Sequence, residues 1–268
     1  MSDFSSTLKI LPLPASLVLL VLACGNHRAA PSEGAQDPPV TVTADTTELV
    51  QLRHEMVRRQ IEDRGVADTA VLRAMREVPR HRFVPDAPPT YAYSDRPLPI
   101  GYGQTISQPY IVAFMAEAAA LEPGDRVLEI GTGSGYGAAV LGRIAAEVFT
   151  VEIVPELAAQ ARKVLEALEF DNVHVRAGNG WLGWPEHAPY DGIVVTAAPD
   201  KVPEALEEQL ARGGTLVIPV GALLQDLQVL RKTARGLEEV RSLPVRFVPM
   251  VGEPPDTGNY RGQAPFRR

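Results

Sequence analysis

Short apolar runs alternate with amphipathic segments along the second half of the chain. Apolar strands joined by crossover helices are typical of a parallel sheet buried on both faces. The pattern therefore predicts an α/β fold with a doubly wound, Rossmann-like, mostly parallel sheet and helices on both faces. The predicted strands are Arg126–Ile130, Val148–Glu152, Val173–Ala177, Gly192–Ala197 and Thr215–Val220, with two more at Leu227–Arg231 and Val245–Val248; the predicted helices are Tyr136–Arg143, Pro155–Leu168 and Pro203–Leu210.

Apolar residues are spaced differently in the first half of the predicted domain. Apolar residues recur at helical spacing from Glu48 to Arg64, and Gly65 ends that pattern. A second helix is predicted from Asp68 to the residue before Pro79, and the following stretch is rich in prolines. We expect one folded domain over residues 46–252, with a helical and loop-rich part at 46–110, a Rossmann-like core at 111–252 and a polar tail at 253–268.

The N-terminus resembles a secretory signal. Residues 10–23 are mostly apolar and follow Lys9, but fourteen residues fall short of the roughly 20 that a membrane-spanning helix needs. The sequence Val21–Cys24 resembles a lipoprotein cleavage box, so residues 1–24 are predicted to be a signal whose Cys24 becomes lipidated. Residues 25–45 are predicted to be a flexible linker. This interpretation predicts location in the cell envelope or periplasm; a cytoplasmic protein with an apolar extension is the alternative.

Composition narrows the function classes. The chain has 268 residues, with Lys+Arg 26 against Asp+Glu 33 and a formal net charge of −7, so it has no broad basic footprint for nucleic acid. Cys24 is the single cysteine, which excludes an intrachain disulfide and a cysteine-rich zinc site. The five histidines show no HExxH spacing. We therefore expect neither a nucleic-acid partner nor a catalytic metal.

A glycine-rich turn directly follows the first predicted strand. The sequence from Glu129 to Gly135 reads Glu-Ile-Gly-Thr-Gly-Ser-Gly, and glycines allow a sharp turn and a close approach to a ligand. Glu152 ends the second strand, 21 residues after Gly131, at the spacing from which an acid reaches the ribose hydroxyls of a bound nucleoside. The turn after the third strand, Gly178–Gly180, is expected to converge on the same place, which predicts a nucleoside pocket.

Spacing alone leaves the identity of the nucleoside open. The stretch Gly133–Ala138 satisfies the GxGxxA pattern, so a dinucleotide remains an alternative. Glu129, at the mouth of the first strand, would repel a pyrophosphate but suits a sulfonium or an amino group. The residues therefore favour S-adenosylmethionine.

Several blocks of the chain resemble the protein-L-isoaspartate O-methyltransferase family, over about residues 50–252. The Gly103–Tyr110 block is the most specific, since the glycine block is shared across many class I methyltransferases. The resemblance implies S-adenosylmethionine-dependent methyl transfer to the free α-carboxylate of L-isoaspartyl residues in damaged proteins and peptides, by a monomeric catalytic domain. The matching blocks are Val78–Pro85, Pro97–Gly101, Gly103–Tyr110, Val127–Tyr136, Ala188–Asp191 and Pro244–Met250.

The resemblance also assigns site residues. Ser107 matches the active-site position, and the residues before it would lie over the methyl donor. The expected cofactor-binding residues are Gln104, Thr105, Ile106, Glu129, Gly131, Gly133, Ser134, Glu152, Gly178, Asn179 and Gly180.

Two positions depart from the family pattern. Asn179 stands where the family commonly has Asp, which replaces a charged acceptor for the adenine amino group by a neutral amide oxygen. We therefore expect weaker cofactor affinity with activity retained. Gly137 stands where the family often has Gln, and the sequence does not indicate the effect.

Alternatives remain for the role of Ser107 and for the function of the whole chain. Ser107 precedes Gln108–Pro109 and has a second interpretation as the N-cap of a helix starting there. For the whole chain, the alternatives are a small-molecule methyltransferase and an exported cofactor- or peptide-binding protein without turnover.

Overall fold

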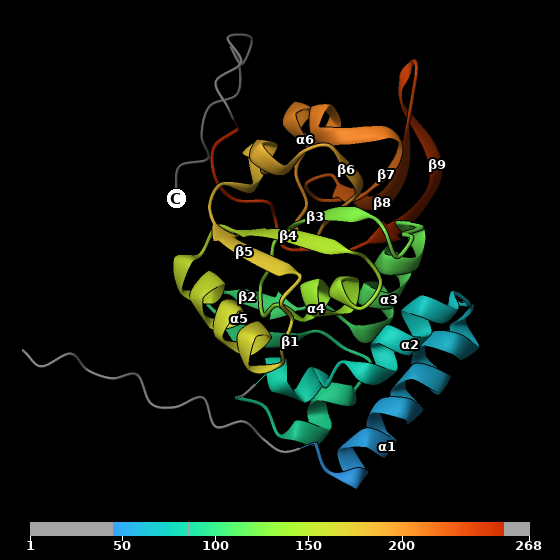
Figure 1. Ribbon diagram of the computed structural model, residues 1–268, viewed down its shortest axis with the longest axis vertical. Coiled ribbons are helices and arrows are strands. Elements are labelled where there is room, and N and C mark those ends of the chain that lie inside the picture. The colour runs from blue at the N-terminus through green and yellow to red at the C-terminus, as the bar shows by residue number, and fades with distance from the viewer. Residues whose placement is uncertain (1–44, 85, 255–268) are drawn as a thin grey trace, which may run out of the picture. The chain divides into compact units, whose positions relative to one another are not determined.

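The computed structural model describes residues 45–84 and 86–254 (Figure 1). The predicted signal 1–24, nearly all of the predicted linker and the tail from residue 255 onward lie outside the described residues. Within the described ranges, no helix is both long and apolar enough to cross a membrane.

A seven-stranded sheet forms the centre of the fold. In space the strands run in the order β5-β4-β3-β6-β7-β8-β9, and β3 to β7 are parallel while β8 and β9 are antiparallel additions at one edge. The chain leaves β3 for β4 on one side and returns to β6 on the other, so the topological switch point lies between β3 and β6. This confirms the predicted fold class. The strands are β3 (Arg126–Ile130), β4 (Glu147–Glu152), β5 (Val173–Ala177), β6 (Tyr190–Val195), β7 (Leu210–Val220), β8 (Gln225–Thr233) and β9 (Gly236–Val245).

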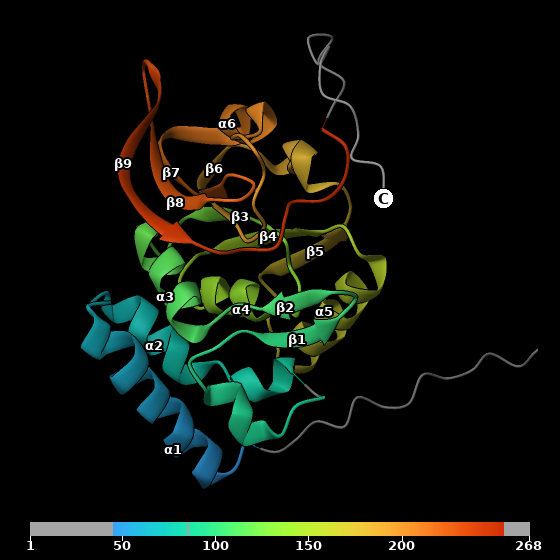
Figure 2. The same ribbon diagram turned by 180° about the vertical axis from the view of Figure 1, so that it is seen from behind.

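Helices cover both faces of the sheet (Figures 1 and 2). The helices α3 (Pro109–Ala118), α4 (Tyr136–Gly142) and α5 (Pro155–Ala167) lie on one face, and the short α6 (Glu204–Gln209) lies on the other. Neighbouring residues of β3 alternate between the two cores, because successive side chains of a strand point to opposite faces. Val127 packs in the core that includes α4, whereas Leu128 packs in the core that includes Leu206 of α6.

Two helices and a small hairpin precede the sheet. Helix α1 (Thr47–Met56) continues through a π turn at Val57–Ile61 and a 3-10 turn at Glu62–Arg64, so the predicted helix is present with an irregular second half. Asp68 is the N-cap of helix α2 (Thr69–Glu77), and its carboxylate accepts hydrogen bonds from two backbone N–H groups of the first turn. The proline-rich stretch contains 3-10 turns at Arg80–Phe83 and Pro89–Tyr93 and then a hairpin of β1 (Leu98–Gly101) and β2 (Gln104–Ile106), which the sequence did not predict.

Two predicted strands differ most from the structure, and the predicted ends of Gly192–Ala197 and Leu227–Arg231 are each shifted by two residues. The last strand is β9, not Val245–Val248. It pairs with β8 along its whole length and is largely exposed and charged, so it carries no apolar run. The apolar residues after Val245 instead form a loop beside β6. Strand β7 begins at Leu210 rather than Thr215, because a register shift opposite Tyr190–Gly192 extends the pairing of the strand through two glycines.

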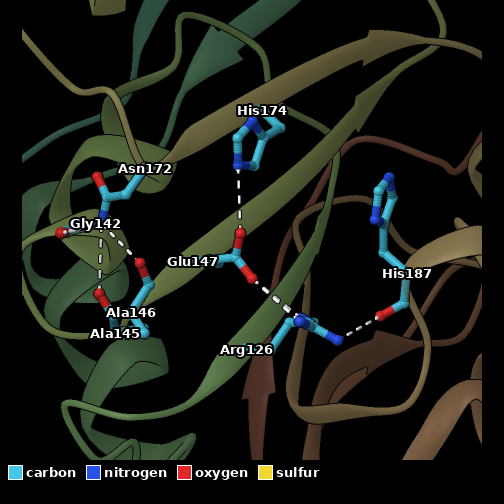
Figure 3. Close-up of polar contacts among 8 residues, drawn as sticks. All are labelled: Arg126, Gly142, Ala145, Ala146, Glu147, Asn172, His174 and His187. Atoms are coloured by element: carbon cyan, nitrogen blue, oxygen red, sulfur yellow. Dashed lines mark hydrogen bonds and ion pairs between the residues drawn. The ribbon is translucent and has the colours of Figure 1, made fainter.

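Polar and aromatic side chains gather at the amino ends of the central strands, and Figure 3 shows the polar contacts among them. Arg126 and Glu147, the first residues of β3 and β4, pair at 3.1 Å, and His174 of β5 lies 3.7 Å from the same carboxylate. The Phe149 ring stacks on His187 with ring centroids 4.1 Å apart. Close by, the Asn172 amide donates to three carbonyls at the end of α4 and the loop after it. Arg126, Glu147 and His174 are partly exposed and, together with Phe149 and His187, line a cavity at this end of the sheet.

The packing of α6 gives a stability prediction. Leu206 is fully buried and is the contact of this short helix with the second core. Leu206→Ala leaves a cavity there, so we expect the free energy of unfolding to fall by about 2–5 kcal/mol. Leu223→Ala, at a side chain that is 98% exposed, serves as the matched control and should change it by less than about 0.5 kcal/mol. Urea denaturation measures both; equal effects would contradict the assignment of α6 to the core.

Candidate functional site

A pocket opens at the carboxyl ends of β3, β4 and β6, next to the switch point of the sheet. Most of the site residues predicted from the sequence line it, although they come from four separate stretches of the chain. The stretch from β2 to α3 forms one wall, the glycine turn after β3 forms the floor, and the end of β4 forms another wall. The predicted residues that line the pocket are Gln104, Thr105, Ile106, Ser107, Glu129, Gly131, Gly133, Ser134, Glu152 and Gly180.

The glycine turn is held between two neighbouring strands. Gly131 has φ 97°, a left-handed conformation that favours glycine, and its N–H donates to the carbonyl of Val151 at 2.8 Å. On the other side the Thr196 hydroxyl donates to the Gly131 carbonyl at 2.7 Å, and a Cβ at residue 131 would overlap that hydroxyl. A larger residue at position 131 would therefore strain the backbone and displace the Thr196 hydroxyl that holds the turn.

Glu152 fixes the shape of the turn through its carboxylate. The side chain is 4% exposed, and its two oxygens accept hydrogen bonds from Gly133 N–H at 2.7 Å and from Val154 N–H at 3.0 Å. Each carboxylate oxygen retains capacity for a further hydrogen bond. Glu152 can therefore hold the glycine turn and accept hydroxyl donors from the pocket at the same time.

Glu129 is the most deeply buried acid of the site. It is 1% exposed and accepts a hydrogen bond of 2.6 Å from the Thr150 hydroxyl. Burial raises the pKa of Glu129 to about 8; the Thr150 hydrogen bond opposes this shift and the nearby charge of Glu152 adds to it. Its carboxyl also lies against the backbone of Gly137, where a Cβ would overlap it. Glycine at 137 therefore leaves the space that this carboxyl occupies.

Ser107 lies between β2 and α3 and lines the pocket. The N-cap of α3 is Gln108, which makes no side-chain capping bond, so the interpretation of Ser107 as the helix cap was wrong. The backbone of Ser107 is held from behind by Arg80, whose guanidinium donates to the Ser107 carbonyl at 2.7 Å and to the Ala92 carbonyl at 2.7 Å. Arg80 is completely buried and faces the Tyr136 ring at 4.8 Å, and burial lowers its pKa to about 10, so it stays charged at neutral pH.

Two predicted residues do not line the pocket. Gly178 donates its N–H to the Glu152 carbonyl at 2.8 Å behind the wall. Asn179 accepts a hydrogen bond from Trp181 N–H at 3.1 Å and donates to the Glu253 carbonyl at 2.7 Å. The side-chain NH₂ group of Asn179 thus binds the C-terminal segment, and an Asp side chain has no such donor. Its expected effect on cofactor affinity stays a prediction.

Other wall residues were not singled out from the sequence. Thr196 follows β6, and the segment 248–251 pairs with the backbone of Ala198 through Ala198 N–H to Val248 O and Met250 N–H to Ala198 O, both 2.8 Å. The block Pro244–Met250 was a signal for this wall, but its contact with the end of β6 depends on a return of the chain from the far edge of the sheet.

The doubly wound sheet, the glycine turn at its switch point and the two acids beside that turn define a Rossmann-like protein with a pocket for a nucleoside-containing cofactor. The chain belongs to the protein-L-isoaspartate(D-aspartate) O-methyltransferase (PCMT) family, whose model matches residues 51–254.

Named relatives and solved structures agree with this membership. A protein-L-isoaspartate O-methyltransferase of Picosynechococcus is 62% identical over 209 residues, which cover 78% of this chain and 93% of the relative. One from Gloeobacter violaceus is 57% identical, with 75% and 98% covered. A solved protein-L-isoaspartate O-methyltransferase superposes with a TM-score of 0.69 at 33% identity, covering 74% of this chain and 66% of that one. A Plasmodium falciparum protein in complex with S-adenosyl-L-homocysteine gives 0.65 at 25% identity, with 74% and 98% covered.

The buried Glu129 predicts a dependence of stability on pH. Because its pKa in the folded state, about 8, lies above its ordinary value of 4.5, the folded protein binds more protons than the unfolded chain between these values. Its contribution to the free energy of unfolding is therefore full below pH 4.5 and is lost as the pH rises through 8, by at most about 1.4 kcal/mol per pH unit. Urea titrations at pH 5.5, 6.5 and 7.5 measure this slope. In Glu129→Gln we expect the slope to be smaller; an unchanged slope would contradict the assignment to Glu129.

Proposed function

We propose that this protein transfers the methyl group of S-adenosylmethionine to the free α-carboxylate of L-isoaspartyl residues in damaged proteins and peptides. The observation that carries the proposal is that Ser107 and the glycine turn, from different parts of the chain, line one pocket at the switch point of a sheet of the PCMT family. The methyl ester would then close to a succinimide, whose hydrolysis returns some normal aspartate.

The pocket residues fit the proposed cofactor. Gly131 and Gly133 line the pocket in left-handed conformations, and such a glycine turn lets the backbone come close to a ligand. Glu152 would accept the ribose hydroxyls, and Glu129 would face the cationic amino or sulfonium group. When bound, S-adenosylmethionine supplies an electrophilic methyl group on a sulfonium. The anionic form of Glu129 is favoured beside a cation, so binding would lower its raised pKa.

The chemistry needs orientation more than acid–base catalysis. A free α-carboxyl group has a pKa of about 3.5, so at neutral pH it is ionised. The carboxylate can then act as the nucleophile without a general base. Ser107 would donate one hydrogen bond that orients this carboxylate. A single neutral hydroxyl suits that role, because a donor that bound the ground-state carboxylate too strongly would oppose the transfer. Arg80 fixes the backbone of Ser107 and so limits where the hydroxyl can point.

The serine gives a direct test of the proposal. In Ser107→Ala we expect kcat for an isoaspartyl peptide to fall about tenfold or more, the loss of one orienting hydrogen bond to a charged group. The affinity for S-adenosyl-L-homocysteine should change less than about twofold, because the variant leaves the glycine turn intact. Ser134→Ala, in the turn itself, is the matched control and should weaken cofactor binding with little direct effect on kcat.

The same assay separates the alternatives. Methylation of the isoaspartyl peptide but not of its aspartyl twin supports a repair enzyme. Methylation of neither peptide, with methyl transfer to a small acceptor, would favour a small-molecule methyltransferase. Cofactor binding without any methyl transfer would favour a binding protein without turnover.

We further propose that the protein is exported and anchored through lipidated Cys24. The support is the sequence alone: a basic residue, a short apolar core and a cysteine after Val21–Ala23, followed by a linker rich in proline and small residues. This location raises the question of supply, since S-adenosylmethionine is a product of cytoplasmic metabolism.

Fractionation of cells tests the anchor. We expect the full chain in the membrane fraction and Cys24→Ser outside it, because the serine cannot be lipidated. Activity toward isoaspartyl peptide should be equal in both, since residue 24 lies outside residues 51–254, which match the family model. Recovery of both proteins in the cytoplasm would overturn the export proposal and leave the methyl-transfer proposal untouched.

A further inference from the structure

Two adjacent leucines are the most exposed large apolar side chains of the described residues. Leu223 is 98% exposed and Leu224 is 89% exposed, and both lie in the turn that joins β7 to β8. Contiguous apolar groups on a surface mark interaction sites more often than single ones do. The packing of the fold does not account for these two side chains, since neither belongs to a core cluster.

The leucine turn is attached to the pocket wall on both sides. At its start the Gly221 N–H donates to the Pro199 carbonyl at 2.9 Å. At its end the Gln225 side chain accepts from Phe247 N–H at 2.6 Å and donates to the Phe247 carbonyl at 3.1 Å. Pro199 lies two residues after Ala197, and Phe247 lies directly before Val248, and both of these neighbours line the pocket. The turn is therefore fixed to the two segments that form the β6 side of the site.

Two further exposed apolar side chains, Val251 and Tyr102, belong to segments that form the pocket. Val251 lines the pocket and is 50% exposed. Tyr102 is 54% exposed at the turn of the β1–β2 hairpin, two residues before Gln104, and Ile100 of the same hairpin lies against Gly133 of the cofactor turn. We call Tyr102, Leu223, Leu224 and Val251 together the apolar rim.

We propose that the apolar rim binds the residues that flank the isoaspartyl residue, so that the enzyme prefers damaged sites with a large apolar side chain within a few positions. The inference rests on the proposed function. A polypeptide whose damaged carboxylate reaches Ser107 has to leave the pocket over its mouth in both directions. The rim side chains carry no charge or strong hydrogen-bonding group apart from the Tyr102 hydroxyl, so they gain most from burying apolar surface. Unfolded segments, whose apolar residues are no longer covered, present that surface.

The test compares two isoaspartyl peptides of equal length and charge, one with leucine on either side of the damaged residue and one with serine there. For the wild-type protein we expect kcat/KM to be about tenfold higher for the leucine peptide, with the difference in KM, because burial of one such side chain is of that size. The double variant Leu223→Ser/Leu224→Ser should lose most of this preference while kcat and the affinity for S-adenosyl-L-homocysteine stay unchanged. Val240→Ser, at a 66% exposed residue of β9, is the matched control and should keep the preference.

Each other outcome counts against the inference. If the wild-type protein has equal kcat/KM for the two peptides, the proposal about the apolar rim is wrong while the proposed function stands. If it methylates neither peptide, both the rim proposal and the proposed function are wrong. A double variant that keeps the preference also overturns the rim. Sedimentation of wild type and double variant identifies a second copy as the occupant if only the wild type forms a dimer. Flotation with phosphatidylcholine–phosphatidylglycerol vesicles identifies a membrane if only the wild type binds, and either result with an unchanged preference contradicts peptide docking.

Discussion

The site depends on one steric constraint at the end of β3. The chain has to turn sharply there while it stays hydrogen-bonded to β4 through Val151 and to the end of β6 through Thr196. Only glycine meets both conditions at residue 131, because its φ of 97° is left-handed and a Cβ would strike the Thr196 hydroxyl. The turn opens the sheet at its switch point, and the pocket is the space that results. Ser107 and the other lining residues are arranged around this opening.

The two acids beside the turn differ because their partners differ. Glu152 accepts hydrogen bonds from two backbone N–H groups, which tie its carboxylate to the turn. Glu129 accepts one hydroxyl hydrogen bond and is otherwise enclosed, so burial raises its pKa to about 8. The pocket therefore contains one acid fixed by backbone donors and one buried acid whose ionised form a bound cation would stabilise. This asymmetry suits a ligand that has neutral hydroxyls at one end and a positive charge at the other.

Much of this arrangement could be predicted from the sequence, and the failures have physical causes. Strands β3 and β5 lie at their predicted residues. Strand β3 is mostly buried, whereas β5 is a half-buried edge strand in which Val173 and Val175 alternate with polar residues. Strand β9 was missed because an exposed edge strand carries charges such as Glu239 and Arg241 in place of such a run. The glycine turn and Glu152 were found because their spacing is local. Thr196 and Arg80 were not singled out, because their roles depend on contacts between segments that are far apart in the sequence.

Long-range contacts form the mouth of the pocket, whereas the local glycine turn forms its floor. After β9 the chain returns from the edge of the sheet to pair with Ala198, and Gln225 fixes this returning segment to the start of β8 through Phe247. The wall is therefore held by backbone hydrogen bonds, by the buried Gln225 amide and by the packing of Phe247 and Met250 against the two cores, whereas Leu223 and Leu224 belong to neither core. Residues of the floor are determined by the cofactor turn, whereas residues such as Leu223 and Val251 can vary without cost to the fold. Substrate preference can thus change at the mouth while the geometry of methyl transfer at the floor is preserved.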